Sequence, residues 1–434
     1  MRVTRAIQFV VGAGAVLALA GQPSAQSDRT ATLAVPGRAN SAPWVASQGR
    51  FVAVTWGAAA DGKSDVYLAT SDDQGGTFGA PVRVNTVLGD GRVSGEIPPR
   101  VALHAAVAGA RPEVVVAWNA KDQGTEVKVA RSRDFGRTFA APVSLQASGA
   151  AGDRGWHSLA LDDQGVAHVL WLDHRGLAGP GGEHVMSASG EHDGVAMAQK
   201  STLTYATFGA TAGAERVLTA GVCYCCKSAI VALPGGTLVS AWRHVYAGNL
   251  RDIAFTVSRD GGRTFAAPAR VSEDGWAIDG CPDDGPALAT GPDQAVHIVW
   301  PTVIPGAEPI GAIFYSTLRA AGGFAPRTRI PTLGGPKPSH PQVAVDGAGS
   351  LVAAWDESLA GVRTAAYVVG TRDAAGVMRF GTPTRLGGSG PSSYPVVASL
   401  KGGVVAAWTS GVVGSSVIRV RVIPITGGTA TAAQ

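Results

Sequence analysis

Charged side chains are scarce in this chain and do not gather in runs. Only 16% of the 434 residues are charged, and 36 Lys and Arg against 32 Asp and Glu give a formal net charge of +4. Because no basic cluster stands out, nucleic-acid binding is not expected. Cysteine is also rare, with four residues, and no C-x-x-C-H sequence for haem attachment occurs.

Long apolar runs are missing except at the N-terminus. There, Arg2 and Arg5 precede the apolar run 7–20, and small residues follow, with cleavage sites after Ala20 or Ala25. This pattern is typical of a secretory signal, so we expect residues 1–25 to be a signal peptide and the protein to be exported, periplasmic or extracellular. An uncleaved N-terminal anchor is the alternative. No later run predicts stable membrane insertion.

Short apolar strands that end in tryptophan recur along the chain. The seven tryptophans are Trp56, Trp118, Trp171, Trp242, Trp300, Trp355 and Trp408. Their intervals leave room for four strands and their turns, which is the content of one propeller blade. We therefore predict an all-β fold, a single β-propeller domain over 28–425 with four-stranded antiparallel blades.

Seven blades are preferred over six. The last repeat supplies only three strands, and the segment Thr30 to Pro36 reads as a loose strand. Pairing it into the last blade would close the ring and remove a free sheet edge. Residues 426–434 are expected to be a disordered tail.

Three polar turns share the pattern S-x-D-x-G-x-T-F. Their Ser, Asp and Gly positions are Ser71, Asp73 and Gly75, then Ser132, Asp134 and Gly136, then Ser258, Asp260 and Gly262. In register with the tryptophan repeat, this pattern resembles the Asp box (BNR repeat) of the sialidase, or neuraminidase-like, propeller superfamily. The resemblance implies that these residues form structural turns between the third and fourth strands, with Asp capping each turn and Gly at positive φ.

The same resemblance raises an exo-glycosidase or sialidase-like hydrolase as an alternative function. Enzymes of that superfamily clamp a substrate carboxylate with three arginines and use a tyrosine nucleophile activated by a glutamate. Weak candidates for such roles here are Arg100, Arg175, Arg243 and Tyr394. The family's early Arg-Ile-Pro signature is missing, and no glutamate is obviously placed beside Tyr394.

All four cysteines fall in two loops that lead into neighbouring repeats. Cys223, Cys225 and Cys226 precede the fourth repeat and Cys281 precedes the fifth. An even cysteine count on an exported chain predicts disulfides, for example one within the first loop and one to Cys281. Thiolate and imidazole ligands would equally suit copper or zinc. Both interpretations stay open from the sequence.

Loops that feed the innermost strands should meet near the propeller axis on one face. We expect that face to gather Trp156, His157, His174, Arg175, His244, Trp276, Asp283 and His340. The leading hypothesis is therefore a propeller that binds a small molecule, a glycan, a protein or a metal ion at a Cys/His-rich axial face. A non-catalytic scaffold with structural disulfides is the third possibility.

Overall fold

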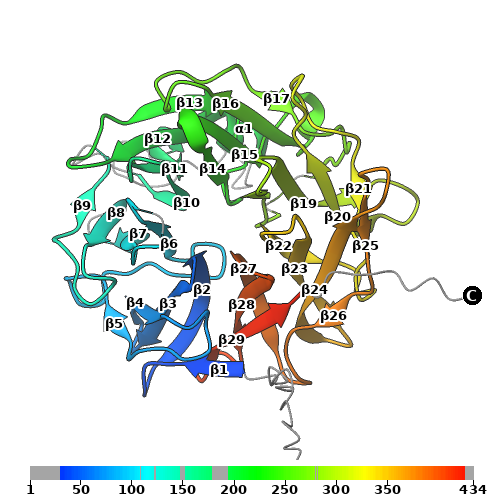
Figure 1. Ribbon diagram of the computed structural model, residues 1–434. Helices are drawn as coiled ribbons and strands as arrows, with labels where there is room; N and C mark the ends of the chain where they lie inside the picture. The colour runs from blue at the N-terminus through cyan, green and yellow to red at the C-terminus, as the bar shows by residue number, and fades with distance from the viewer. Residues whose placement is uncertain are drawn as a thin grey trace, which may run out of the picture.

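Seven antiparallel sheets are arranged radially around a common axis (Figure 1). This computed structural model describes residues 30–425 except 108, 122–123, 147–151, 178–193, 279 and 281. The seven-bladed β-propeller predicted from the tryptophan repeat is thus confirmed, and the six-bladed alternative is wrong. The predicted signal peptide (1–25) and tail (426–434) lie outside the described residues and stay predictions.

The first four blades each contain four strands, numbered here from the axis outward. They are β2 (Ala39–Gln48), β3 (Phe51–Ala60), β4 (Lys63–Ser71) and β5 (Val82–Arg83); β6 (Arg100–His104), β7 (Glu113–Lys121), β8 (Thr125–Ser132) and β9 (Val143–Ser144); β10 (Arg154–Leu161), β11 (Ala167–Asp173), β12 (Thr202–Phe208) and β13 (Arg216–Ala220); and β14 (Ala229–Leu233), β15 (Thr237–Arg243), β16 (Ile253–Ser258) and β17 (Ala269–Arg270).

The remaining three blades follow the same order, and the last one takes its outermost strand from the start of the chain. They are β18 (Ala287–Thr290), β19 (Val296–Ile304), β20 (Ile310–Thr317) and β21 (Thr328–Arg329); β22 (Ser339–Val345), β23 (Leu351–Leu359), β24 (Val362–Arg372) and β25 (Met378–Phe380), with β26 (Thr384–Arg385) also on β24; and β27 (Ser392–Leu400), β28 (Gly403–Ser410), β29 (Val417–Pro424) and β1 (Thr30–Leu33).

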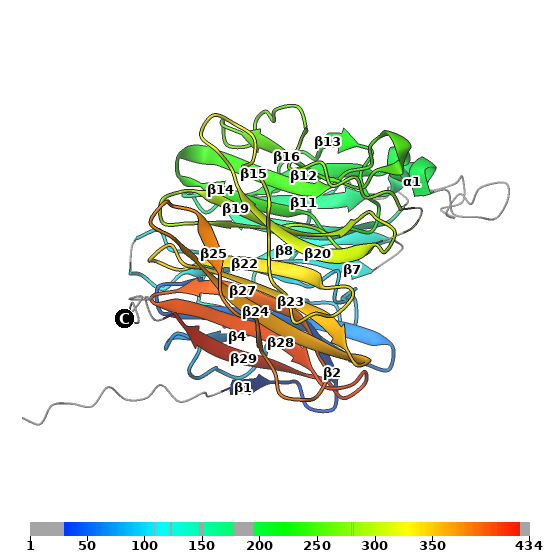
Figure 2. The same ribbon diagram turned by 90° about the vertical axis from the view of Figure 1, so that its right-hand side faces the viewer.

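Helical structure is confined to short segments in the loops. These are α1 (Gly194–Lys200), η1 (Arg175–Leu177), η2 (Pro234–Gly236) and η3 (Ala247–Asn249). Figure 2 shows α1 on one face of the ring, beyond the ends of the sheets. Within the described part of the chain, no helix has the length and apolar character needed to cross a membrane.

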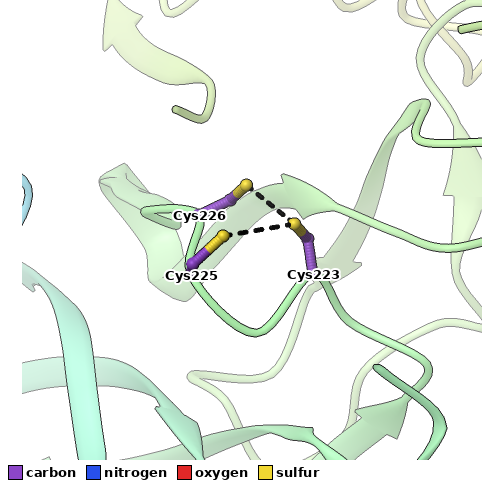
Figure 3. Close-up of side chains that lie close together, drawn as sticks. All are labelled: Cys223, Cys225 and Cys226. Carbon is purple, nitrogen blue, oxygen red and sulfur yellow. Dashed lines mark hydrogen bonds between the residues drawn. The ribbon is translucent and has the colours of Figure 1, made fainter. Parts of the chain in front are cut away.

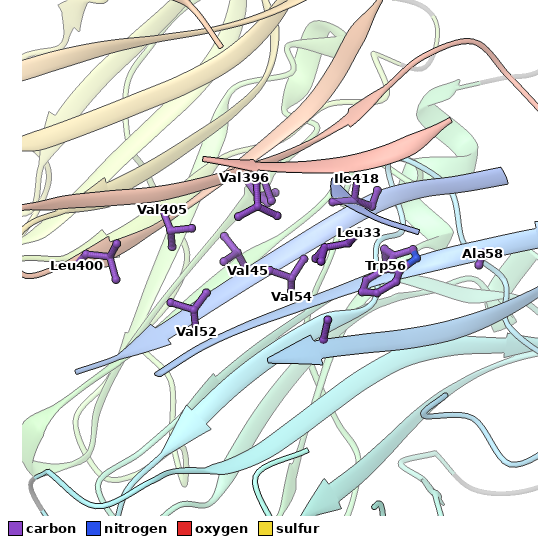
Figure 4. Close-up of a cluster of buried hydrophobic side chains, with 13 residues drawn as sticks. Leu33, Val45, Val52, Val54, Trp56, Ala58, Val396, Leu400, Val405 and Ile418 are labelled. Carbon is purple, nitrogen blue, oxygen red and sulfur yellow. The ribbon is translucent and has the colours of Figure 1, made fainter. Parts of the chain in front are cut away.

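The repeated tryptophans lie in the second strand of every blade and are at most 2% exposed. Trp56, for example, packs with Val405 and Ile418 of the last blade in one apolar cluster between neighbouring sheets (Figure 4). Burying a large aromatic side chain between sheets contributes roughly 2–3 kcal/mol. The tryptophan repeat therefore marks the packing between blades.

The ring is closed by pairing the first described strand with the last. β1 runs antiparallel to β29, with Thr30 opposite Arg421 and Leu33 opposite Ile418. Figure 1 shows the blue strand beside the red one. Leu33 is buried in the same cluster as Trp56, so both backbone pairing and apolar packing hold the closure.

The carboxylate of each S-x-D-x-G-x-T-F turn accepts hydrogen bonds from residues of the same turn. Asp134 accepts hydrogen bonds from the Ser132 hydroxyl (2.8 Å), the Thr138 amide (2.9 Å) and the Thr138 hydroxyl (2.6 Å). Gly136, at φ 86°, adopts a conformation that favours glycine. The hydrogen bond from the Thr138 hydroxyl makes the largest contribution in lowering the pKa of Asp134 to about 2. The same bonds recur at Asp73 and Asp260.

Candidate functional site

The inner strands bend where they begin, at one end of the ring. β10, β22 and β27 each carry a bulge there, and a non-glycine residue at each bulge has positive φ: Trp156 (51°), His340 (56°) and Tyr394 (51°). Asp283 (53°), just before β18, shares this conformation. Bulges re-aim side chains out of the ladder, and left-handed backbone at such residues is costly, so their gathering at one end marks a candidate site.

Three cysteines form a buried cluster in the loop between β13 and β14. The Cys223 sulfur lies 2.8 Å from the Cys226 sulfur and 3.9 Å from the Cys225 sulfur (Figure 3). All three side chains are almost completely buried, against Trp156, Tyr224 and other apolar neighbours. A tight turn holds them together, because the Cys226 amide donates to the Cys223 carbonyl (3.3 Å). The three sulfurs lie close enough to hold a metal ion.

Two buried arginines border this cysteine cluster. Arg251 is 0% exposed, and its Nη1 lies 3.4 Å from the Cys223 sulfur. Arg243 is 1% exposed and donates only to backbone carbonyls, those of Asp284, Arg251 and Pro301. Within the described part of the chain, neither guanidinium forms an ion pair with a carboxylate. Two buried positive charges therefore lie near the sulfur atoms, and Arg243 also interacts electrostatically with Asp252 without a direct ion pair.

This environment favours a negative charge on one sulfur. Burial opposes ionisation of Cys223, but the hydrogen bond from Cys226 and the guanidinium groups of Arg243 and Arg251 together lower the pKa of the Cys223 thiol. Burial and the neighbouring Cys223 instead raise the pKa of the Cys226 thiol. The pair thus combines one readily ionised sulfur with one that retains its proton.

A second group surrounds His340 at the same end of the ring. The imidazole Nε2 lies 2.7 Å from Glu96 Oε1, and Nδ1 lies 2.8 Å from Asp356 Oδ1. The Tyr394 ring stacks on the imidazole with centroids 4.3 Å apart. Burial opposes the charged form, yet the two carboxylates raise the pKa of His340 to about 9. His340 is therefore an imidazolium at neutral pH.

Asp284 connects the two groups. One carboxylate oxygen accepts from the His340 amide (2.6 Å), and the other lies 3.3 Å from Lys227 Nζ, next to the cysteines. The Asp284 amide donates to the Cys226 sulfur. The cysteine cluster and the His340 group thus form one continuous buried polar region, to which the fourth to seventh blades and Glu96 of the second blade contribute.

The arginines considered as carboxylate clamps do not converge on a common point. Arg100 stacks on the Trp44 ring (3.6 Å) and donates to the His157 carbonyl. Arg175 is paired with Asp173 (2.8 Å) and Glu215 (2.7 Å). Arg243 is held by the backbone carbonyls named above. Burial raises the pKa of Tyr394, which opposes its activation as a nucleophile.

The remaining predicted ligand-face residues are placed as follows. His157 is 1% exposed and bonded to Asn119 (2.7 Å) and the Ala117 carbonyl (2.9 Å), and burial lowers its pKa to about 3. The His174 ring lies against Trp156, with centroids 5.4 Å apart. His157 is thus bonded to β7 of the neighbouring second blade, whereas Trp156 contacts the cysteines.

Three further residues border the cysteine loop or the axial mouth. His244 pairs with Val222 through an isolated backbone bridge, and its ring lies 4.6 Å from that of Tyr246. The Arg243 guanidinium lies over the Trp276 ring (4.8 Å). Asp283 is exposed as a whole residue, but partial burial of its carboxylate and the nearby Glu96 raise its pKa. Cys281 lies outside the described residues.

Sequence reasoning missed Asp356 and the role of Glu96. Asp356 follows the repeated Trp355 directly, so its side chain points to the opposite side of β23 from the tryptophan. That alternation was the available signal. The Glu96–His340 contact joins the second blade to the sixth and follows only from ring closure.

A small enclosed cavity lies deeper along the axis, among the inner strands. Its volume is about 50 Å³, and its lining includes Trp44, Arg100, Ser158, Lys227 and Gln342. A space of this size holds a few water molecules. Larger cavities, of about 500 and 610 Å³, lie elsewhere, beside Arg131 and Gly209.

Fold and site together define a seven-bladed propeller with a buried thiol cluster beside an acid–imidazole group. No family model and no curated protein matches the chain. Among solved structures, a family 25 polysaccharide lyase, an ulvan lyase, is similar with a TM-score of 0.51 and 10% identity over 89% of this chain and 94% of that one.

Two other solved structures show the same architecture at lower similarity. The NanB sialidase from Streptococcus pneumoniae gives a TM-score of 0.48 and 11% identity, covering 85% of this chain and 83% of that one. A family 93 α-L-arabinofuranosidase from Fusarium graminearum gives 0.47 and 13%, covering 89% and 93%. At these identities the likeness shows the propeller fold alone.

Proposed function

We propose that this chain is an exported propeller that binds the soft cation Cu(I) through Cys223 and Cys226 on its axial face. The observation that carries the proposal is the pair of buried guanidiniums, Arg243 and Arg251, which have no carboxylate partner within the described part of the chain. Buried charges require compensation, and the adjoining sulfurs supply it as thiolates.

Copper(I) fits this donor set better than zinc. Structural zinc sites take four ligands in a tetrahedron, whereas three sulfurs gather here within the described part of the chain. Soft thiolates select Cu(I). Two thiolates and one Cu(I) carry a net charge of −1, which offsets part of the positive charge of the two neighbouring guanidiniums. Copper, rather than zinc, is therefore the metal that we assign to this site.

We also propose that Cys225 forms a disulfide with Cys281 and thereby fixes the cysteine loop. Cys223 and Cys226 are free cysteines within the described part of the chain, which leaves Cys225 as the partner that we propose for Cys281. Cys281 is the one other cysteine in the sequence. Thiol titration of the unfolded protein is expected to give two free thiols before reduction and four after it. Four before reduction, or none, would contradict this assignment.

The metal assignment is tested by competition for Cu(I) with a chromophoric chelator such as bicinchoninate, under ascorbate rather than a thiol reductant. The full chain should withdraw one Cu(I) from the chelator. Cys223→Ser and Cys226→Ser should lose this binding, while the double variant Cys225→Ser/Cys281→Ser, which removes both cysteines of the proposed disulfide and leaves no new thiol, should keep it. Equal binding by wild type and Cys223→Ser would refute the proposal.

A carbohydrate-active enzyme is the second candidate. It is favoured by Glu96, whose second carboxylate oxygen is buried and has no hydrogen-bond partner among the described residues, beside the His340 imidazolium and the Tyr394 ring. Glycoside hydrolases and a polysaccharide lyase are among the similar structures, but that likeness is one of fold. Turnover of an aryl-glycoside, sialoside and polyuronate panel that disappears in Glu96→Gln would support this function. No turnover across the panel would remove it.

A further inference from the structure

We propose that Cys223 and Cys226 form a reversible disulfide when they react with hydrogen peroxide, and that this bond closes the metal site. The part of this inference that concerns metal release rests on the function proposed above. The disulfide chemistry itself rests on the positions of the sulfurs and does not depend on copper.

The two sulfur separations in the cluster differ in kind. Two thiolates at about 2.3 Å from a shared metal, at a tetrahedral angle, lie roughly 3.8 Å apart. The Cys223–Cys226 separation of 2.8 Å is clearly shorter than this value and than the Cys223–Cys225 separation of 3.9 Å, so Cys223 and Cys226 must move apart to share a metal ion. Figure 3 shows both side chains pointing toward each other from one turn of the loop. This pair is already placed for a sulfur–sulfur bond.

The local sequence explains this closeness. Cys223 and Cys226 are three residues apart, in a C-x-x-C arrangement, and the Cys226 amide donates to the Cys223 carbonyl. The Cys223 amide in turn donates to the Arg243 carbonyl (2.9 Å), which fixes the start of the turn to β15. Forming the bond therefore requires side-chain rotation and little movement of the backbone.

Contacts around the pair decide which sulfur reacts first. Arg251 Nη1 lies 3.4 Å from the Cys223 sulfur, and a guanidinium at that position stabilises a sulfur anion, which is the nucleophilic form. The Cys226 sulfur instead accepts from the Asp284 amide. Cys223 is thus the attacking residue and Cys226 the resolving residue.

Burial selects the oxidant. Cys223 and Cys226 are 0% and 1% exposed, and Trp156, Tyr224 and Val245 pack over the cluster. A bulky disulfide reagent needs the loop to open before it reaches either sulfur, whereas peroxide is scarcely larger than water. Oxidation by peroxide should therefore be much faster than reaction of the folded protein with an aromatic disulfide.

The reaction balances in two steps. The Cys223 thiolate attacks one peroxide oxygen, the O–O bond breaks, and hydroxide leaves, which gives a sulfenic acid on Cys223. The Cys226 thiol then attacks that sulfur. The S–S bond forms, the S–O bond breaks, and the oxygen leaves as water with the Cys226 proton. The two sulfurs lose two electrons in total and peroxide gains them.

Intact-mass analysis of the full, metal-free chain after peroxide treatment tests the inference. Wild type and the double variant Cys225→Ser/Cys281→Ser should each lose the mass of two hydrogen atoms, and the double variant should regain that mass on reduction. Cys226→Ser should retain the sulfenic acid, which dimedone traps on Cys223, and Cys223→Ser should give no adduct. Near-ultraviolet circular dichroism of each variant checks that the fold is kept. Cys226→Ala serves as a second variant that lacks the resolving thiol.

The outcomes separate this inference from the copper proposal. An unchanged wild-type mass after peroxide, or a dimedone adduct on Cys226 instead of Cys223, overturns the switch even if the reduced chain binds Cu(I). Disulfide formation in a chain that never binds Cu(I) supports the thiol chemistry and refutes the copper site. Binding by the reduced chain that is lost after peroxide and restored by reduction supports both.

Discussion

We expect the wild-type protein to lose stability at alkaline pH as His340 is deprotonated, and we expect a substitution that removes the His340 imidazole to abolish this loss. His340 is 8% exposed and lies between the carboxylates of Glu96 and Asp356, with Asp284 at its amide. Arg363 faces the same group from β24, where it pairs with Asp356 (2.6 Å). His340→Asn is the suitable substitution, because asparagine tolerates the positive φ of this position.

The sign and size of the expected change in the free energy of unfolding follow from the linkage between protonation and folding. The pKa of His340 is about 9 in the folded protein, and an unperturbed histidine titrates near pH 6.5. The stabilisation is therefore fully present below about pH 6.5 and is lost as the pH rises through about 9. A shift of roughly 2.5 units corresponds to about 3 kcal/mol, an upper value because the carboxylates titrate together with the imidazole.

The assay is urea denaturation followed by tryptophan fluorescence, at intervals from pH 6 to pH 10. The free energy of unfolding of wild type should fall by about 2–3 kcal/mol more than that of His340→Asn over this range. His104→Asn, on the inner strand β6 of the second blade, serves as the control and should follow wild type. Parallel curves for wild type and His340→Asn would refute the reasoning.

Four other perturbations test separate features. Trp355→Phe removes an indole N–H that donates to Glu357 (2.7 Å). By chemical denaturation, it should lower the free energy of unfolding by roughly 1–3 kcal/mol more than Trp118→Phe, whose indole N–H has no partner among the described residues. Equal losses would contradict the assigned hydrogen bond. Gly95→Ala would place a methyl group 2.1 Å from the Tyr394 ring and should lower stability by about 1–3 kcal/mol, whereas Gly347→Ala, with open space around it, should not. Asp73→Ala removes three bonds from its turn and should lower the melting temperature, while Asp72→Ala next to it serves as control; no shift would count against a structural role. Burial lowers the pKa of His297 to about 4, so its contribution to stability should be lost as the pH falls from about 6.5 toward 4, and the difference between wild type and His297→Phe in that window measures it.

The propeller ring could be predicted from the sequence because the tryptophan pattern that marks each blade is local and repeated. Each blade places one tryptophan at the same position of its second strand, so the spacing favoured seven sheets and left six as the alternative. The closure by β1 followed from a missing strand in the last repeat and is confirmed by its pairing with β29.

The site was only partly accessible, for two physical reasons. The bulges that aim Trp156, His340 and Tyr394 have positive φ without glycine or asparagine, so the residue types carry no sign of the backbone conformation. The decisive partners are also remote in sequence: Glu96 meets His340 from four blades away, and Arg251 meets Cys223 from a different loop. Such contacts follow from the geometry of the assembled ring.

Completion of the last blade by β1 has a consequence for how the molecule forms. The sheet that contains β27, β28 and β29 needs a strand from the opposite end of the chain, and the apolar cluster around Leu33 and Ile418 exists only once both ends are present. During synthesis, six blades are complete in sequence before the seventh, and the toroid stays open until the last strand emerges. The final cooperative step of folding therefore joins the oldest and the newest segments of the polypeptide.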